Sequence, residues 1–191
     1  MGKKRKDYYK GCQCRPKQKL ELISVVPFQM GNSKISSLLA YFLHEAPNIE
    51  SIHSPIIHKS IHDEIIYKMF ENRKFIEKKF CAFNCKIEEE LKKYKLDGEE
   101  ICLGCERFLC KYEKPRNNIK ETDLECLLRH IRNSIAHGRV YYKHCGNRIQ
   151  IMFEDRNQKN KVTARIVCIN ADLKHWKYIL EGYSMKYRKN S

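Results

Sequence analysis

The sequence predicts a mainly α-helical protein, a bundle of about four or five helices followed by a β-hairpin and a short final helix. Apolar residues recur at intervals of three and four over residues 34–46, 56–94 and 122–138, which is the period of helices that bury one face. After residue 138 the pattern changes to short, β-branched runs on either side of a polar turn, which is typical of a hairpin.

Length and charge limit the number of domains and the classes of partner that we expect for this protein. Its 191 residues suffice for one domain with a hydrophobic core, and we expect that domain over residues 20–183. Residues 1–19 are predicted to form a basic N-terminal arm and residues 184–191 a basic tail. The formal net charge of +15 favours a polyanionic partner, most often nucleic acid, with an anionic membrane surface as the rival.

The sequence does not carry the marks of a membrane or secreted protein. No apolar run approaches the length needed to span a bilayer, and the N-terminus lacks the apolar segment of a signal peptide. Ten cysteines in a chain without a secretion signal are expected in a reducing compartment rather than in disulfides. We therefore expect a cytoplasmic protein with no membrane partner.

The first part of the domain is expected to contain one extended segment and the start of the helices. Residues 20–28 are apolar and partly β-branched, which indicates a strand or an extended segment leading into the domain. Residues 34–46 predict a helix that Pro47 ends. Ser54 followed by Pro55 predicts the start of the next helix, with Ser as the cap and Pro at the first helical position.

The middle of the chain carries the longest helical pattern. The apolar period that follows Pro55 continues to about residue 94, as one long helix or as two in sequence. Residues 99–112 give only a weak helical pattern, which Gly104 weakens further.

Residues 122–138 predict the best-defined helix of the chain. Thr122 is a good N-cap, and Glu125 three residues later completes a capping box. Gly138 lies where helices commonly end in the left-handed conformation. A single apolar stripe runs along this helix: Leu124, Leu127, Leu128, Ile131 and Ile135.

The C-terminal part is expected to change to strands and then back to helix. Residues 148–153 look extended and residues 162–169 alternate, and they flank the polar turn of residues 155–161. We therefore expect a β-hairpin over about residues 140–169. Residues 170–181 predict a short final helix.

We expect function on the polar face of the 122–138 helix. At about 100° per residue, four polar side chains fall on the side away from the stripe: Arg129, Arg132, Asn133 and His137. An imidazole is suited to proton transfer near neutral pH, and a guanidinium forks onto a phosphate. On the helix alone, a solvated polar face is the simpler interpretation.

A family resemblance favours a functional site over a solvated polar face. The run RNSIAH, from Arg132 to His137, resembles the R-x4-H motif of the HEPN superfamily, with the polar residue that commonly follows the arginine. The resemblance covers mainly residues 56–140 and implies an HEPN-like helical bundle with the motif on a late helix. The predicted hairpin and final helix are similar to the C-terminal extension of some bacterial HEPN nucleases.

The resemblance also implies an activity. HEPN ribonucleases form composite sites across a dimer interface, cleave RNA without a metal, and are described as leaving a 2′,3′-cyclic phosphate. Carried onto this chain, His137 is the general acid/base, Arg132 stabilises the phosphate, and Asn133 orients it. We therefore expect a homodimeric, metal-independent endoribonuclease that works by 2′-OH attack, as a defence or toxin effector.

A second hypothesis is a non-catalytic HEPN module that binds RNA or dimerises, with an antitoxin or regulatory protein as its partner. One toxin subclass carries Tyr two residues after the His, and Arg139 at that position argues against membership of it. Four neighbours are expected to add RNA contacts: Arg129, Arg139, Tyr141 and Lys143. A half-buried position in the hairpin is an equally good interpretation of Tyr141.

We expect no metal and no cofactor. Cys102, Cys105 and Cys110 lie close together, but structural zinc usually takes four ligands from two similar pairs, so free thiols are the preferred interpretation. His58 and His62 lie one helical turn apart without the Glu of the metalloprotease motif. The cysteines among apolar residues are predicted to be small buried hydrophobes: Cys81, Cys85, Cys126 and Cys168.

Overall fold

The computed structural model describes residues 18–19, 33–71, 81–84, 87–98, 100–101, 103, 106–113, 120–145 and 148–188. The helices of this part are α1 (Ser33–His44), the 3-10 helix η2 (Lys59–Ile61), α2 (His62–Glu71), α3 (Ile87–Lys93), α4 (Asp123–Ala136) and α5 (Asn170–Arg188). The strands are β1 (Gln18–Lys19), β2 (Cys81–Asn84), β3 (Glu100–Ile101), β4 (Arg107–Lys111), β5 (Val140–Cys145), β6 (Arg148–Arg156) and β7 (Val162–Ile169).

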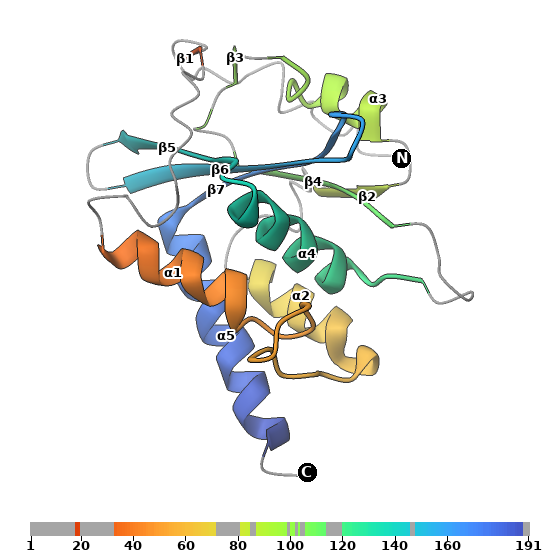
Figure 1. Cartoon of the computed structure of the whole chain (residues 1–191), viewed down its shortest axis with the longest axis vertical. Coiled ribbons are helices and arrows are strands. Elements are labelled where there is room, and N and C mark those ends of the chain that lie inside the picture. Colours follow the sequence, from red (N-terminus) through yellow and green to blue (C-terminus); the bar gives the residue numbers. More distant parts are fainter. Residues whose placement is uncertain are drawn as a thin grey trace, which may run out of the picture.

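A five-stranded sheet in the order β2-β4-β7-β6-β5 crosses the molecule (Figure 1). Strands β4, β7, β6 and β5 pair antiparallel, and β2 joins β4 in parallel. Helices α1, α2, α4 and α5 lie on one side of this sheet and α3 on the other (Figure 1). Strands β1 and β3 form a separate antiparallel pair.

The fold is therefore mixed α/β, and the prediction of a mainly α fold is wrong. Strand β2 lies within the 56–94 stretch that was expected to be helical, and β4 lies within residues 99–112. In β4, Phe108 packs on the face of the sheet that α1, α2, α4 and α5 cover, and Leu109 packs on the face that α3 covers. Because both faces of such a strand are buried, its sequence lacks the apolar–polar alternation that marks a half-exposed strand.

Two hydrophobic cores follow from this layering. The first lies between the sheet and α1, α2, α4 and α5, and the second lies between the sheet and α3. Neighbouring residues of β5 show the alternation, because Tyr141 packs in the second core and Tyr142 against the first. The buried indole of Trp176 ties α5 to α2 by donating to the Met69 carbonyl at 3.1 Å.

The helix start predicted at Ser54 and Pro55 is wrong, because residues 54–58 carry no helix. The side chain of Asn48 explains the difference. Its oxygen accepts from the Ile57 N–H at 2.7 Å, and its nitrogen donates to the Ile57 carbonyl at 2.9 Å. The Ser54 hydroxyl donates to the Ala46 carbonyl at 2.7 Å instead of capping a helix, and the helical region begins at η2.

Other elements agree with the sequence. The helix predicted at 34–46 is α1, the 122–138 helix is α4, and the predicted hairpin is β6 with β7, to which β5 adds a third strand. The final helix is longer than predicted: α5 spans 19 residues and enters the segment expected as a basic tail. Its first turn is secured by Asp172, which accepts from the Ile169 N–H at 2.8 Å.

Some predictions fall outside the described residues. The segment 20–28 is one of them, and of the arm at 1–19 the structure describes Gln18 and Lys19, which pair with Ile101 and Glu100. The domain boundaries at residues 19 and 183 therefore stay predictions. Within the described part, every helix is too short or too polar to cross a membrane.

Candidate functional site

Helix α4 is fixed at both ends by its own sequence. The Thr122 hydroxyl accepts from the Glu125 N–H at 3.2 Å, and the Glu125 carboxylate accepts from the Thr122 N–H at 2.9 Å, which confirms the predicted capping box. At the other end Gly138 has a φ of 64°, the left-handed conformation in which helices commonly end. These two features fix the first and last residues of the helix, and with them the positions of the motif residues along it.

The buried surface of α4 is wider than its apolar stripe. The predicted stripe is confirmed, since each of its residues is at most 2% exposed: Leu124, Leu127, Leu128, Ile131 and Ile135. A second buried row, Cys126, His130 and Ser134, runs beside it. The polar face left for a ligand is therefore narrower than predicted.

Arg132 reaches from α4 to the loop after α1. One guanidinium nitrogen donates to the Glu50 carbonyl at 2.7 Å. The Nε–H is buried and has no acceptor among the described residues. A buried N–H without an acceptor is rare in folded proteins, so this side chain has hydrogen-bonding capacity that the described part of one chain does not use.

Asn133 and His137 lie one turn apart on α4 and have different surroundings. The Asn133 side-chain NH2 donates to the Asp155 carboxylate on β6 at 3.2 Å, so the amide is half-buried and held in place. His137 is the C-cap of the helix, and its side chain is exposed. The motif thus combines one exposed imidazole with two side chains that the fold orients.

Arg129 was expected to contact RNA and instead has partners within the chain. Its guanidinium pairs with both oxygens of Glu121, at 2.6 and 2.9 Å, and donates to the Lys111 carbonyl at 3.0 Å. Burial opposes its charge, but the hydrogen bond and charge of Glu121 outweigh burial and raise the pKa of Arg129. An RNA phosphate would have to compete with this bidentate pair.

The remaining predicted RNA contacts lie on or beside β5, one of the two edge strands of the five-stranded sheet. Tyr141 is 5% exposed and packs toward α3, where burial and then the charge of Glu154 raise its pKa. It therefore lies on the sheet face away from α4. Arg139 and Lys143 are both half-buried.

A buried imidazole next to the motif was not anticipated from the sequence. His130 is 1% exposed, and its Nδ1 lies 2.7 Å from the same Asp155 oxygen that accepts from Asn133. Its Nε2 lies 2.8 Å from the Lys111 carbonyl on β4. The available signal was that His130 lies four residues from both Cys126 and Ser134, beside the stripe; Asp155 was assigned to a turn.

Cys126, His130 and Asp155 are the residue types of a nucleophile–base–acid triad. The Cys126 side chain is fully buried and donates to the Lys111 carbonyl at 3.5 Å. Neighbouring Cys110 lowers the pKa of Cys126, burial opposes this, and His130 lowers it further. Because all three are at most 4% exposed, no substrate reaches this thiol, and the cluster is not a nucleophilic site.

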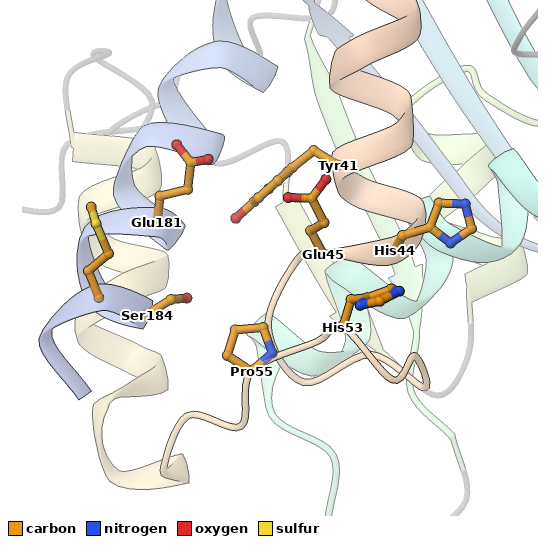
Figure 2. Close-up of a pocket in the computed structure, with 8 residues that line it drawn as sticks. Tyr41, His44, Glu45, His53, Pro55, Glu181 and Ser184 are labelled. Carbon is orange, nitrogen blue, oxygen red and sulfur yellow. The ribbon is translucent and has the colours of Figure 1, made fainter. Parts of the chain in front are cut away.

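A hollow of about 900 Å³ opens between α1, the loop after it and α5 (Figure 2). Figure 2 shows Glu181 and Ser184 on α5 across from Tyr41 and Glu45. Burial, then the charges of Glu181 and Glu45, raise the pKa of Tyr41. Motif residues do not line this hollow, and two carboxylates repel a phosphate, so it is not the candidate site.

Cysteines and histidines of the described part do not gather into a metal site, since no group of three or more His, Cys, Asp or Glu is placed to share an ion there. Cys110, Cys126 and Cys168 are buried free thiols, which confirms the prediction for Cys126 and Cys168. Cys81, Cys85, Cys102 and Cys105 have no described side chains, so the predictions for them stay open.

His58 and His62 serve separate structural purposes. The His58 side chain accepts from the Ser60 N–H at the start of η2. His62 is buried, and its ring joins Asn48, at 2.7 Å, to the Thr122 hydroxyl, at 2.8 Å. This link holds the loop after α1 against the start of α4, on which the motif lies.

Comparison with known proteins agrees with the family resemblance. The model of the family described as HEPN pEK499 p136 matches residues 16–191, whereas comparisons with curated proteins and with solved structures gave no match. A HEPN domain supports a nuclease or RNA-binding module in general, and HEPN domains typically bind RNA and often dimerise. Because the match takes in α4 and nearly all of the chain, the chain belongs to the HEPN pEK499 p136 family.

Proposed function

We propose that this protein is a metal-independent endoribonuclease whose active site forms between two copies of the chain. The observation that carries the proposal is the C-terminal end of α4 in a HEPN family member. There, an exposed His137 follows an Arg132 whose Nε–H has no acceptor among the described residues. These are a proton-transfer group and an anion-binding group on one end of one helix.

The chemistry is a transesterification at an RNA phosphate. A base removes the proton of the 2′-OH, the 2′-oxygen bonds to phosphorus, and the bond from phosphorus to the 5′-oxygen breaks as that oxygen is protonated. The products are a 2′,3′-cyclic phosphate and a 5′-hydroxyl. His137 serves as the proton-transfer group, and Arg132 stabilises the charge that develops on the phosphate oxygens.

Arg132 can turn to a phosphate at small cost. In the single chain it donates to the neutral carbonyl of Glu50. Exchanging that bond for a bond to phosphate is favourable, because the phosphate carries a full negative charge and can accept from two guanidinium N–H groups at once. The Nε–H that lacks an acceptor can then be satisfied as well.

Two copies supply what one chain lacks. Cleavage needs a base on one side of the phosphate and an acid on the other, and each chain offers one exposed imidazole at the end of α4. A two-fold dimer would place two such ends opposite each other. The net charge of +15 favours RNA as the substrate, and Arg139 and Lys143 are proposed as further phosphate contacts.

The cellular part of the proposal follows from the HEPN resemblance. We propose a defence or toxin effector in the cytoplasm that an antitoxin or regulatory protein controls. Its target RNA would be set by contacts outside the motif, because the motif binds only the phosphate and the 2′-OH.

The second candidate function is an RNA-binding or dimerising module without turnover. One observation favours it: Asn133 and Arg132 both have hydrogen-bond partners within the chain, so the motif is not arranged around a free phosphate. In that case RNA would bind the full chain without cleavage, and His137→Ala would leave the affinity unchanged.

The decisive experiment measures cleavage of a labelled RNA by the purified full chain in EDTA. His137→Ala is expected to lower the rate by at least about 100-fold while circular dichroism and the melting temperature stay the same, since this side chain is exposed. His44→Ala is the matched control, because His44 is also an exposed histidine at the end of a helix. It is expected to cleave like the wild type.

Three outcomes would overturn the proposal: cleavage that needs a divalent ion, cleavage that survives His137→Ala, or full activity of a species that sedimentation shows to be monomeric. Mass spectrometry of the products adds an independent check, because a 3′-phosphate formed without a cyclic intermediate would exclude 2′-OH attack.

A further inference from the structure

The two shortest contacts of His130 favour a buried cation. Its Nδ1 faces the Asp155 carboxylate at 2.7 Å, and its Nε2 faces the Lys111 carbonyl at 2.8 Å. Both of these groups only accept hydrogen bonds, so the two short contacts are satisfied together when both ring nitrogens carry a proton. Arg129 Nη2, a donor, also lies near Nε2, but at 3.3 Å this contact is the longest of the three. A doubly protonated imidazole in a core is costly unless a fixed anion compensates it, and Asp155 is that anion.

The charges around the ring agree with this protonation state. Burial alone would lower the pKa of His130, but Asp155 and the neighbouring Cys126 reverse the effect and raise it to about 9. Arg129, on the same helix, acts in the opposite direction, and Glu121 pairs with it. Burial would raise the pKa of Asp155, yet the bond and charge of His130 hold it below its usual value.

The same carboxylate fixes the orientation of a motif side chain. Asp155 Oδ2 accepts from the Asn133 NH2 at 3.2 Å as well as from His130. Because a carboxylate cannot donate, the amide must turn its NH2, and not its oxygen, toward Asp155. The amide group is planar, so donation of one N–H fixes the direction of the second.

We propose that His130 and Asp155 are positioning residues of the motif, which hold the Asn133 amide so that its second N–H is aimed at the RNA phosphate. The inference rests on the proposed ribonuclease function. In this arrangement β4 holds His130 through the Lys111 carbonyl, His130 holds Asp155 on β6, and Asp155 holds Asn133 on α4. The sheet thereby sets the geometry of a side chain on the polar face of the helix.

The network gives the motif a pH dependence that has a defined sign. As pH rises through about 9, His130 loses its proton, and the attraction between its positive charge and the Asp155 carboxylate is lost. Asp155, and with it the Asn133 amide that donates to it, is then held less firmly. Cleavage by the wild type is therefore expected to fall on the alkaline side for a reason that does not involve His137.

A double-mutant cycle on the full chain tests the positioning role. Asp155→Asn and Asn133→Ala are each expected to lower kcat by about 10-fold to about 100-fold with little change in KM, because a misplaced group costs turnover more than binding. The double variant is expected to lose no more than Asn133→Ala alone, since the two act through one contact. The alkaline limb of the pH profile should move to lower pH in Asp155→Asn.

Glu154→Gln is the matched control. Glu154 is the neighbouring buried carboxylate of β6, it is also ion-paired, and it bonds Arg165 and Arg156 instead of the motif. It is expected to lower the melting temperature while leaving kcat per folded molecule unchanged. If Asp155→Asn does not fold, the pH profiles of the wild type and Asn133→Ala serve instead, and the alkaline limb should be absent from the latter.

The outcomes separate the two proposals. Three results would each overturn the positioning role. The first is a double variant whose kcat loss is the product of the two single losses. The others are a kcat loss in Glu154→Gln as large as that in Asp155→Asn, or an unchanged alkaline limb in Asn133→Ala. They would leave the ribonuclease assignment standing, provided that the wild type cleaves and His137→Ala does not. A wild type that does not cleave RNA would overturn both.

Discussion

Two buried ion-pair networks start from neighbouring residues of β6 and lie on opposite faces of the sheet. On the α3 side, Glu154 pairs with Arg165 at 2.7 Å and with Arg156 at 2.6 Å. On the α4 side, Asp155 pairs with His130 at 2.7 Å. Both carboxylates are at most 4% exposed.

The two networks differ in where they end. The Arg165 guanidinium continues to the backbone carbonyls of Leu96 and Gly98, so the Glu154 network links parts of the scaffold. The Asp155 network ends on Asn133, a residue of the motif. Buried charge by itself is therefore not a mark of function in this molecule; what distinguishes the two sides is the connection to the polar face of α4.

The largest expected effect on stability would test whether the two faces are independent. Glu154→Leu should lower the free energy of unfolding by about 3 kcal/mol or more, because it leaves the buried Arg165 guanidinium without its anion. RNA cleavage per folded molecule should stay at the wild-type level. Urea denaturation and the cleavage assay measure the two quantities. A loss of cleavage in fully folded protein would show that the two faces of the sheet are not independent.

Asp155→Leu is the counterpart on the other face. A similar loss of stability is expected, since it leaves His130 buried without its anion, but here cleavage should fall as well.

The second prediction concerns pH. Both networks should weaken in acid, because the pKa values of Glu154 and Asp155 are both held low, but only the network of His130 should also weaken at alkaline pH. Burial would raise the pKa of Glu154, but Arg156 and Arg165 hold it below its usual value, so its stabilisation is present above the unfolded pKa and is lost as pH falls. The pKa of His130 is raised to about 9. Its stabilisation, on the order of 3 kcal/mol, is present below the unfolded pKa and is lost as pH rises through about 9.

Urea denaturation between acid and alkaline pH measures both limbs. His130→Gln is expected to flatten the alkaline limb and to keep the part of the acid limb that belongs to Glu154. An alkaline limb of wild-type size in this variant would assign the loss to another group.

A smaller effect is expected at the N-terminal end of α4, far from the motif. Thr122→Ala should lower the free energy of unfolding by about 1–2 kcal/mol, because it removes both the cap and the hydroxyl that bonds the buried His62. Thr122→Ser keeps the hydroxyl and should restore the wild-type value. Cleavage at saturating RNA should match the wild type in both variants, and a drop in kcat would show that the cap also orients the motif.

The smallest effect on stability should come from the motif itself. Arg132→Gln should lower the free energy of unfolding by no more than about 1 kcal/mol, because it loses one hydrogen bond to a backbone carbonyl. Cleavage should nevertheless fall by at least about 10-fold. Lys174→Gln removes the same charge from an exposed position on α5 and controls for weaker attraction of RNA.

The local part of the site was predictable. The capping box of Thr122 and Glu125, the stripe from Leu124 to Ile135 and the end at Gly138 follow from interactions within four residues along the chain, and all are confirmed. The HEPN resemblance read from Arg132 and His137 is confirmed by the family match. The catalytic role of these residues stays a prediction.

The fold class was not predictable in the same way. Strand β4 is short and has a buried residue on each face, and its parallel partner β2 comes from a stretch with an apparent helical period. Whether such runs become strand or helix depends on which partners cover them. Those partners, β7 on one side and β2 on the other, come from distant parts of the sequence.

By itself the sequence determined helix α4, its two ends, its apolar stripe and the motif residues it carries, because capping and periodicity are local properties of the chain. Only the tertiary structure decided that β4 is a strand and that His130 meets Asp155, 25 residues away, which in turn holds Asn133. Those contacts exist only in the assembled sheet, since β6 and β4 supply the two acceptors that make a buried imidazolium tolerable.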